Sequence, residues 1–228
     1  MEKLTLYSGP LSMFGAKVQI ALLEKDIPAE IVMVPFEMKA LYEPKHAEVL
    51  RINPKRQVPV LVHGDLEIFD STQIFEYLED LKPERPLWPR DIVARARARR
   101  LELESDEVYF PHVIRLMGLQ DQMQDPAAVT ACSNCAGFYA RLDHHLSDGR
   151  PWLAGDDYTY ADIAFFMAQV FGARMQAPMS DMAPHLLAWR NRMMQRRPVQ
   201  IVAGAMARWL LTQARPLPQF MQQLAEAA

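Results

Sequence analysis

The first half of the chain alternates short apolar runs with segments in which apolar residues recur at helical spacing. Short β-branched runs are typical of strands, and apolar residues every three or four positions are typical of helices. Strands are predicted at 4–7, 31–34, 60–62 and 66–69, and helices at 16–24 and about 72–81. The fully apolar run 31–34 is of the kind buried in a parallel sheet. His63-Gly64-Asp65 indicates a hairpin between the last two strands. The pattern predicts an α/β layer.

A proline-rich segment separates this layer from a different second half. Pro83, Pro86 and Pro89 fall within one short stretch, which is incompatible with the interior of a helix or a central strand. Beyond it, helical spacing predominates at about 92–118, 127–147, 160–175, 183–196 and 199–213. We therefore expect an α/β domain over 1–81, a linker over 82–91 and an all-helical domain over 92–228.

One predicted helix carries a strong start signal. Thr159 precedes the helix as its N-cap, and Asp162 stands at the third helical position, which is a variant of the capping box. Tyr158 and Ile163 flank the cap as a hydrophobic staple. We expect a well-capped, buried helix here.

Composition restricts the classes of partner. With 228 residues and 50% hydrophobic content, the chain can bury a substantial core. A net charge of −3 and a pI near 6.1 argue against nucleic acid or an anionic membrane as the main partner. No charged-then-apolar leader and no apolar run near the roughly 20 residues of a membrane span is present. Two cysteines are too few for a disulfide framework. These features favour a soluble, cytoplasmic protein.

Two short motifs suggest a binding site for a small peptide. Pro59 begins an apolar run and cannot donate to a strand ladder, so it belongs at a strand start or an edge. A cis Val58–Pro59 bond would leave the Val58 backbone facing outward, where an extended peptide can pair with it. Asp70 and Ser71 end one strand and begin a helix, where they can bind the ammonium and carboxylate of an amino acid. Their alternative role is an ordinary helix cap.

The order of these motifs resembles the soluble glutathione transferase superfamily. Asn53-Pro54 with Val58-Pro59 and Leu61, then Asp70-Ser71, and Thr159-x-Ala161-Asp162 carry the resemblance, which covers nearly the whole chain. The resemblance implies a thioredoxin-like N-terminal domain that binds glutathione and a helical domain that supplies most of the electrophile pocket. It also implies a cytoplasmic homodimer that acts in detoxification, with glutathione as co-substrate and no metal.

Carried over residue by residue, the resemblance assigns two sets of site residues. Val58 corresponds to the residue that pairs with the cysteinyl moiety, Pro59 to the cis-proline, and Asp70 and Ser71 to the γ-glutamyl site. The glycyl end is assigned to Gln57 and to either Lys39 or Lys45. The electrophile pocket is assigned to Tyr109, His112 and Met117. Arg56 stands where glycine is common in the family, and we expect this change to perturb the loop little.

Catalysis in this superfamily depends on ionising the thiol of glutathione. A free thiol has a pKa of about 8.5, and the thiolate is the nucleophile. A hydroxyl donor from the turn after the first strand would stabilise the anion, and Ser12 matches the serine of theta-like, bacterial members. Ser12 can also cap the following helix; Ser8 and Tyr7 are alternative donors.

The same turn contains no cysteine and no Ser-Ser-Cys motif. Its sequence therefore argues against thiol–disulfide exchange and does not favour maleylacetoacetate isomerisation. Cys132 and Cys135 have redox-motif spacing but lie in a predicted helix, and we interpret them as buried structural residues.

The resemblance leads us to expect an enzyme that conjugates glutathione to a small apolar electrophile. Two alternatives remain open at this point. One is a glutathione-dependent reductase or peroxidase. The other is a non-catalytic interaction protein of the same fold, as the stringent starvation proteins are.

Overall fold

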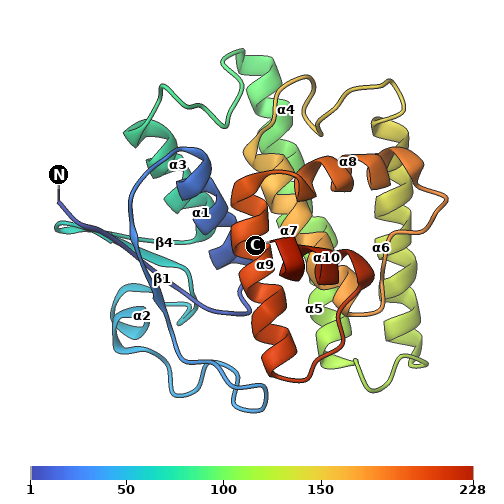
Figure 1. Ribbon diagram of the computed structural model, residues 1–228, viewed down its shortest axis with the longest axis horizontal. Coiled ribbons are helices and arrows are strands. Elements are labelled where there is room, and N and C mark those ends of the chain that lie inside the picture. Colours follow the sequence, from blue (N-terminus) through green and yellow to red (C-terminus); the bar gives the residue numbers. More distant parts are fainter. Residues whose placement is uncertain (1, 228) are drawn as a thin grey trace.

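The computed structural model describes residues 2–227 (Figure 1). It contains one four-stranded mixed sheet in the order β2-β1-β3-β4. The strands are β1 (Leu4–Ser8), β2 (Glu30–Met33), β3 (Val60–His63) and β4 (Leu66–Phe69). β1 runs parallel to β2 and antiparallel to β3, and β3 and β4 form the predicted hairpin. Helices α1 (Met13–Glu24), α2 (Ala47–Ile52) and α3 (Ser71–Leu81) complete this half.

A strand forms near the predicted residues 31–34, but the prediction that this strand is buried is wrong. β2 lies at the edge of the sheet, and Ile31 and Met33 are 37% and 49% exposed. Only the following Val34, after the strand ends, is buried. An apolar run reports strand propensity but does not distinguish a central position from an edge, because that depends on which strands pair with it.

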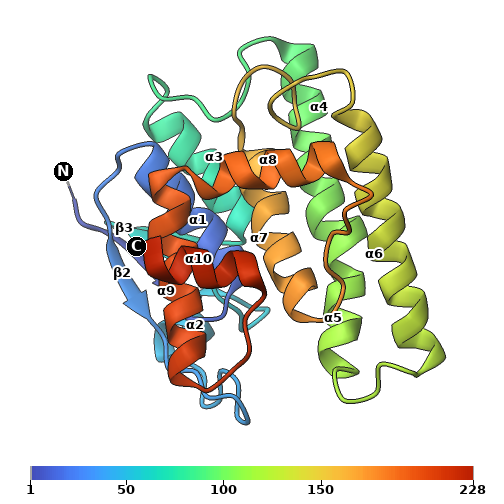
Figure 2. The same ribbon diagram turned by 45° about the vertical axis from the view of Figure 1, so that its right-hand side comes forward.

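The second half of the molecule is helical (Figure 2). Its elements are α4 (Ile92–Leu103), the π-helical segment η1 (Glu104–Tyr109), α5 (Phe110–Gly118), α6 (Pro126–His145), α7 (Tyr160–Arg174), α8 (Pro184–Met194), α9 (Arg197–Thr212) and α10 (Gln219–Ala227). The predicted helix 92–118 is thus one helical run interrupted by a π-helical segment. The sequence pattern did not predict α10, a short helix that packs on α9.

Helix α7 forms the centre of the helical half, and residues 160–173 along it are all buried. Its start is the predicted cap: the Thr159 backbone N–H and hydroxyl donate to Asp162 Oδ2 at 2.9 and 3.0 Å. Asp162 Oδ1 accepts from the Leu153 N–H and from the Trp189 indole, both at 2.9 Å. A buried carboxylate is tolerated here because four donors satisfy it.

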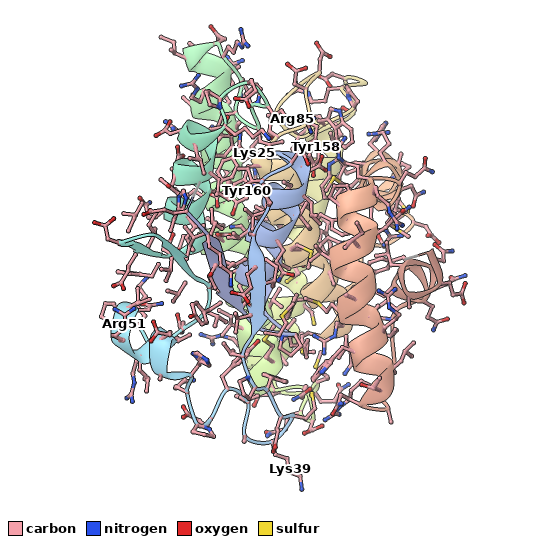
Figure 3. All side chains as sticks on the ribbon, turned by 60° about the vertical axis from the view of Figure 1, so that its left-hand side comes forward. Lys25, Lys39, Arg51, Arg85, Tyr158 and Tyr160 are labelled. Carbon is pink, nitrogen blue, oxygen red and sulfur yellow. The ribbon has the colours of Figure 1, made fainter. Side chains whose placement is uncertain are left out.

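The two halves pack against each other through α1 and α7. The Phe75 ring of α3 stacks on the Tyr160 ring at the start of α7, with centroids 3.7 Å apart. The irregular segment between α3 and α4 is held by the buried Lys25, whose ammonium donates to Glu79 at 2.7 Å and to the Arg85 carbonyl at 2.8 Å (Figure 3). The candidate site lies at the other end of α1, where Ser12 begins the helix.

Between residues 2 and 227, no helix has the length and apolar character needed to cross a bilayer.

Candidate functional site

Two neighbouring cavities share a wall formed by Phe14, Gln57 and Val58. The larger cavity, about 460 Å³, is also lined by Pro59, Asp70, Ser71, Thr72, Glu102 and Asp106, among others. The smaller cavity, about 320 Å³, is lined by residues that include Ser12, Tyr42, Lys45, Phe110, Met117 and Phe171. The Val58–Pro59 peptide bond in the shared region is cis. A ligand extended along Val58 can therefore reach both cavities.

Ser12 lies at the start of α1, on the wall of the smaller cavity. Its Oγ accepts a hydrogen bond from the Gly15 backbone N–H at 2.9 Å, and the residue is 7% exposed. A hydroxyl that accepts one bond still carries a hydrogen to donate. Ser12 is thus a helix cap whose O–H can also serve a ligand in the cavity.

The two alternative hydroxyls occupy other positions. Ser8 is fully buried and accepts from the Gln19 side-chain amide at 2.9 Å. Tyr7 points to the face of the sheet opposite to that of its neighbour Ser8, and its ring lies 5.1 Å from the His46 ring. Neither residue lines the smaller or the larger cavity. Of the three hydroxyls considered from the sequence, Ser12 alone faces the candidate site.

The loop before Val58 is shaped by Asn53, a residue that sequence reasoning used as a motif but not as a site residue. Its side-chain amide donates to the Gln57 carbonyl at 2.6 Å, and its Oδ1 accepts from the Lys55 N–H at 2.9 Å. Arg56 adopts the left-handed conformation with φ +57°, which glycine adopts at least cost. The loop therefore keeps a backbone conformation suited to glycine although it carries arginine.

Asp70 and Ser71 lie together at the start of α3, on the wall of the larger cavity. Asp70 has φ +77°, and its Oδ1 accepts from the backbone N–H groups of Thr72 and Gln73 at 3.1 and 3.4 Å. The Ser71 carbonyl accepts from the Tyr160 hydroxyl at 3.2 Å. The helix-cap role considered for this pair is therefore present, and the same N-terminal helix end attracts an anionic group.

A buried charged cluster forms the floor of the larger cavity, and nothing in the sequence pattern indicated it. The Lys17 ammonium of α1 is 2.9 Å from Glu102 Oε1 and also contacts Asp106 Oδ2. The Thr72 hydroxyl donates to the same Glu102 oxygen at 2.8 Å. Burial raises the pKa of Asp106 to about 6, although the neighbouring Lys17 favours its ionised form. The cluster joins both halves of the molecule directly beside Asp70 and Ser71.

Three residues assigned from the resemblance lie outside both cavities. Lys39 is exposed at the outer tip of the loop after β2 and points away from the molecule (Figure 3), so Lys45 is the lysine that lines the smaller cavity. Tyr109 is fully buried, with its hydroxyl bonded to that of Tyr139. His112 is half-buried and lines neither cavity. The assignments of Lys39, Tyr109 and His112 are corrected accordingly.

Helix geometry explains why Met117 lines the smaller cavity and His112 does not. Phe110 and Met117 are seven positions apart, which is nearly two full turns, so both face the smaller cavity. His112 is two positions from Phe110 and is therefore rotated by about 200° around the helix axis. Tyr109 turns toward α6 and α7, where the rings of Phe138 and Phe165 lie 5.2 and 5.3 Å away.

Two family models match most of the chain. One, described as "Glutathione S-transferase, N-terminal domain", matches residues 6–86, and the other, "Glutathione S-transferase, C-terminal domain", matches residues 98–197. The region that the first family model matches therefore contains the turn between β1 and α1, Val58-Pro59 and Asp70-Ser71.

Individual proteins show the same similarity. The chain is 38% identical over 183 residues to a stringent starvation protein A homolog from Coxiella burnetii, covering 80% of this chain and 77% of that protein. It is 44% identical to Glutathione S-transferase 1 from Dianthus caryophyllus over 99 residues, and so spans only 42% of the length of that relative. The structure superposes on a glutathione S-transferase from Rhodospirillum rubrum with a TM-score of 0.79 at 26% identity, covering 97% of this chain and 99% of the other.

Proposed function

The chain belongs to the glutathione S-transferase superfamily, and we propose on that premise that it conjugates the glutathione thiolate to a small apolar electrophile. The observation that carries this proposal is the shared wall at Val58, which joins a cavity containing Ser12 to a cavity containing Asp70 and Ser71. A tripeptide lying along Val58 would place its ends in different cavities and its sulfur beside the smaller one.

The charges of the two cavities support one orientation of glutathione. Asp70, Glu102 and Asp106 line the larger cavity, which suits the ammonium of the γ-glutamyl group, while the N–H groups at the start of α3 suit its carboxylate. Lys45 and Arg56 line the smaller cavity and suit the glycyl carboxylate. Gln57, in the shared wall, can bind the peptide between these ends.

In this orientation Ser12 would stabilise the thiolate. Its hydroxyl would donate to the ligand's sulfur and favour ionisation, because a hydrogen bond to the charged form of a group lowers its pKa. The thiolate then attacks the electrophile, forming a carbon–sulfur bond while the leaving group departs with the electron pair. Phe110, Met117 and Phe171 would form an apolar wall for the electrophile.

We also propose a cytoplasmic homodimer. Leu103, Val108 and Ile114, on the run from α4 to α5, are 55%, 51% and 54% exposed. Leu103 and Ile114 both border the larger cavity, and exposed apolar side chains that lie together favour an interface.

The proposal is tested by calorimetric titration of the protein with glutathione, followed by an assay of conjugation to an aryl halide. We expect saturable binding and enzyme-dependent conjugation. If the protein binds glutathione but conjugates it to none of several electrophile classes, the transferase reaction is excluded and only glutathione binding is supported. The absence of any binding heat at several temperatures would contradict both glutathione binding and the transferase reaction.

A non-catalytic interaction protein is the second candidate. It is favoured by the 38% identity over 183 residues to a stringent starvation protein A homolog. The same titration separates the two candidates, because an interaction protein that has lost the ligand site would not bind glutathione.

A further inference from the structure

Ser8, the last residue of β1, packs directly against the first turn of α1. Its side chain is fully buried and lines neither cavity, so it does not contact a ligand in either of them. A Cβ atom built on Gly15 would lie 2.1 Å from the Ser8 hydroxyl oxygen. The oxygen therefore occupies the space that a side chain at position 15 would need, and glycine allows the strand and the helix to approach this closely.

The Ser8 hydroxyl is fixed by Gln19, which lies one turn beyond Gly15 on α1. The Gln19 side-chain amide donates to the Ser8 oxygen at 2.9 Å, and Gln19 is almost fully buried. A hydrogen bond in the protein interior is electrostatically stronger than one in water. The Ser8 oxygen is thus held at one position beside Gly15.

Gly15 is also the residue that holds the Ser12 hydroxyl oxygen. The Gly15 backbone N–H donates to Ser12 Oγ at 2.9 Å, and the Cβ position on Gly15 lies 3.1 Å from the same oxygen. Ser8 and Ser12 therefore meet the same glycine, one from the strand and one from the start of the helix. A shift of Gly15 relative to β1 would move the donor to Ser12 Oγ, and with it the direction in which the Ser12 hydroxyl points.

The turn between the two serines is itself tightly packed. The Ser12 N–H donates to the Gly9 carbonyl at 3.2 Å. A Cβ atom built on Gly9 would lie 2.3 Å from the Tyr42 hydroxyl oxygen, so the Tyr42 ring lies directly on the turn. Because the turn cannot readily absorb a shift of Gly15, we expect such a shift to reach the Ser12 hydroxyl.

We propose that Ser8, held by Gln19, is a positioning residue that aims the Ser12 hydroxyl at the thiol of glutathione through Gly15. The inference rests on the proposed function and extends it, because it assigns a role in catalysis to a hydroxyl that does not contact the ligand. A hydrogen bond weakens steeply when its donor is misaligned, and a misplacement of about 1 Å can cost about 10²-fold in rate. Buried groups that lock a catalytic side chain in place prevent such misplacement.

The test uses Gly15→Ala, Ser8→Ala and the protein that carries both substitutions. Gly137→Ala is the matched control, because Gly137 lies within α6 and a Cβ atom built on it would meet no side chain of residues 2–227 within 4 Å. The pKa of the thiol of bound glutathione is measured from its thiolate absorbance as the pH is raised. Affinity is measured separately with S-methylglutathione, which cannot form a thiolate, and the melting temperature reports on folding.

We expect Gly15→Ala to raise the thiol pKa by about one unit, which is an approximately ten-fold smaller thiolate-to-thiol ratio at a given pH. Ser8→Ala should raise it by less, because the first turn of α1 can then settle toward β1. Added to Gly15→Ala, however, Ser8→Ala should lower the thiol pKa, because it removes the oxygen that the new Cβ strikes and leaves only the Ser8 Cβ at 3.2 Å. This reversal of sign requires a contact between the two residues.

Two further variants keep the test independent of general destabilisation. Gly137→Ala should leave the thiol pKa unchanged and raise the melting temperature, since alanine favours a helix more than glycine does. Gln19→Leu removes the amide that holds the Ser8 oxygen and leaves Gly15 unchanged. It should raise the thiol pKa as Ser8→Ala does, and it should cause no further rise when added to Ser8→Ala. S-methylglutathione should bind all variants with wild-type affinity, because Ser8, Gly15 and Gln19 line neither cavity.

A thiol pKa that stays at the wild-type value in Ser8→Ala and Gln19→Leu would overturn the role of Ser8 while leaving the proposed function in place. A higher thiol pKa in the double variant than in Gly15→Ala would overturn it too, because the two residues would then act independently. A wild-type protein that does not lower the thiol pKa at all would contradict the proposed function itself, and the role of Ser8 with it.

Discussion

The Lys17 ammonium and the Glu102 carboxylate, 85 residues apart in the chain, lie 2.9 Å apart with side chains 0% and 5% exposed. They come from the first helix of the α/β half and the first helix of the helical half. Burial by itself would lower the pKa of Lys17, but its neighbours Tyr160, Asp106 and Glu102 raise it above its ordinary value. The pair therefore stays charged and fixes the two halves beside the larger cavity.

Removing the cation should destabilise the protein strongly. Lys17→Met would leave two buried carboxylates without their partner, at a cost of about 3–5 kcal/mol in the free energy of unfolding. Lys3→Met is the control, since the Lys3 side chain is 70% exposed in its ion pair with Glu30 and an exposed pair contributes at most about 1 kcal/mol. Urea unfolding measures both variants. A cost below about 1 kcal/mol for Lys17→Met would contradict the role given to this cluster.

Asp106 should make the protein less stable as the pH rises from about 4 to 6. Its pKa in the folded state is about 6, above the usual value near 4. In this window the folded form keeps a proton that the unfolded form has lost, so the free energy of unfolding falls with rising pH. The fall is up to about 3 kcal/mol, and it should be absent from Asp106→Asn.

Urea unfolding of wild type and Asp106→Asn between pH 3 and pH 7 measures this effect as a difference. Asp148→Asn is a control of opposite sign, because its hydrogen bonds to Arg150 hold the pKa of Asp148 below its usual range. The contribution of Asp148 is present above about pH 4 and is lost as the pH falls further. Parallel stability curves for wild type and Asp106→Asn would show that Asp106 ionises normally.

Arg56→Gly should stabilise the loop before Val58. Arg56 has φ +57°, and a side chain in this conformation costs about 1 kcal/mol that glycine does not incur. Lys55→Gly, one position earlier and outside the left-handed region, should instead destabilise the protein by a similar amount. Melting temperatures of the two variants should shift in opposite directions. Destabilisation by both would show that the Arg56 side chain contributes more than its backbone strain.

Thr159→Ala should cost about 1 kcal/mol or more of stability. The Thr159 hydroxyl donates to Asp162 Oδ2 at 3.0 Å at the buried start of α7, and alanine would remove that donor. Thr159→Ser keeps the hydroxyl and should recover most of the loss. Denaturant unfolding of the two variants gives the comparison; identical values for alanine and serine would assign the effect to the lost methyl group.

Ser12→Ala should sharply lower turnover with a general electrophile while leaving glutathione binding largely intact. The expected loss is about 10²-fold in kcat, typical of removing one donor to a developing or bound anion. The variant also loses the cap of α1, at about 1 kcal/mol, so its melting temperature is measured alongside. Ser12→Thr preserves both the cap and the hydroxyl and should retain activity. Full activity in Ser12→Ala would remove Ser12 from the mechanism.

Local patterns along the chain were enough to predict the features that depend on a few consecutive residues. The Thr159–Asp162 cap, the β3–β4 hairpin and the placement of Asp70 at the start of α3 follow from local spacing and from the chemistry of caps and turns. Val58 and Pro59 were located in the same way, from a proline at the mouth of an apolar run. Such patterns extend over one or two turns, so one sequence suffices to read them.

Contacts between residues that are distant in the chain could be found only in the folded structure. The Lys17–Glu102 pair and the approach of Tyr42 to Gly9 join segments that no local pattern connects. The packing of whole elements also buries Tyr109 in the helical core, leaves Lys39 at the loop tip and places β2 at the sheet edge. The physical reason is that a side chain's partners depend on how whole elements pack, whereas periodicity along the chain reports only which face of an element is apolar.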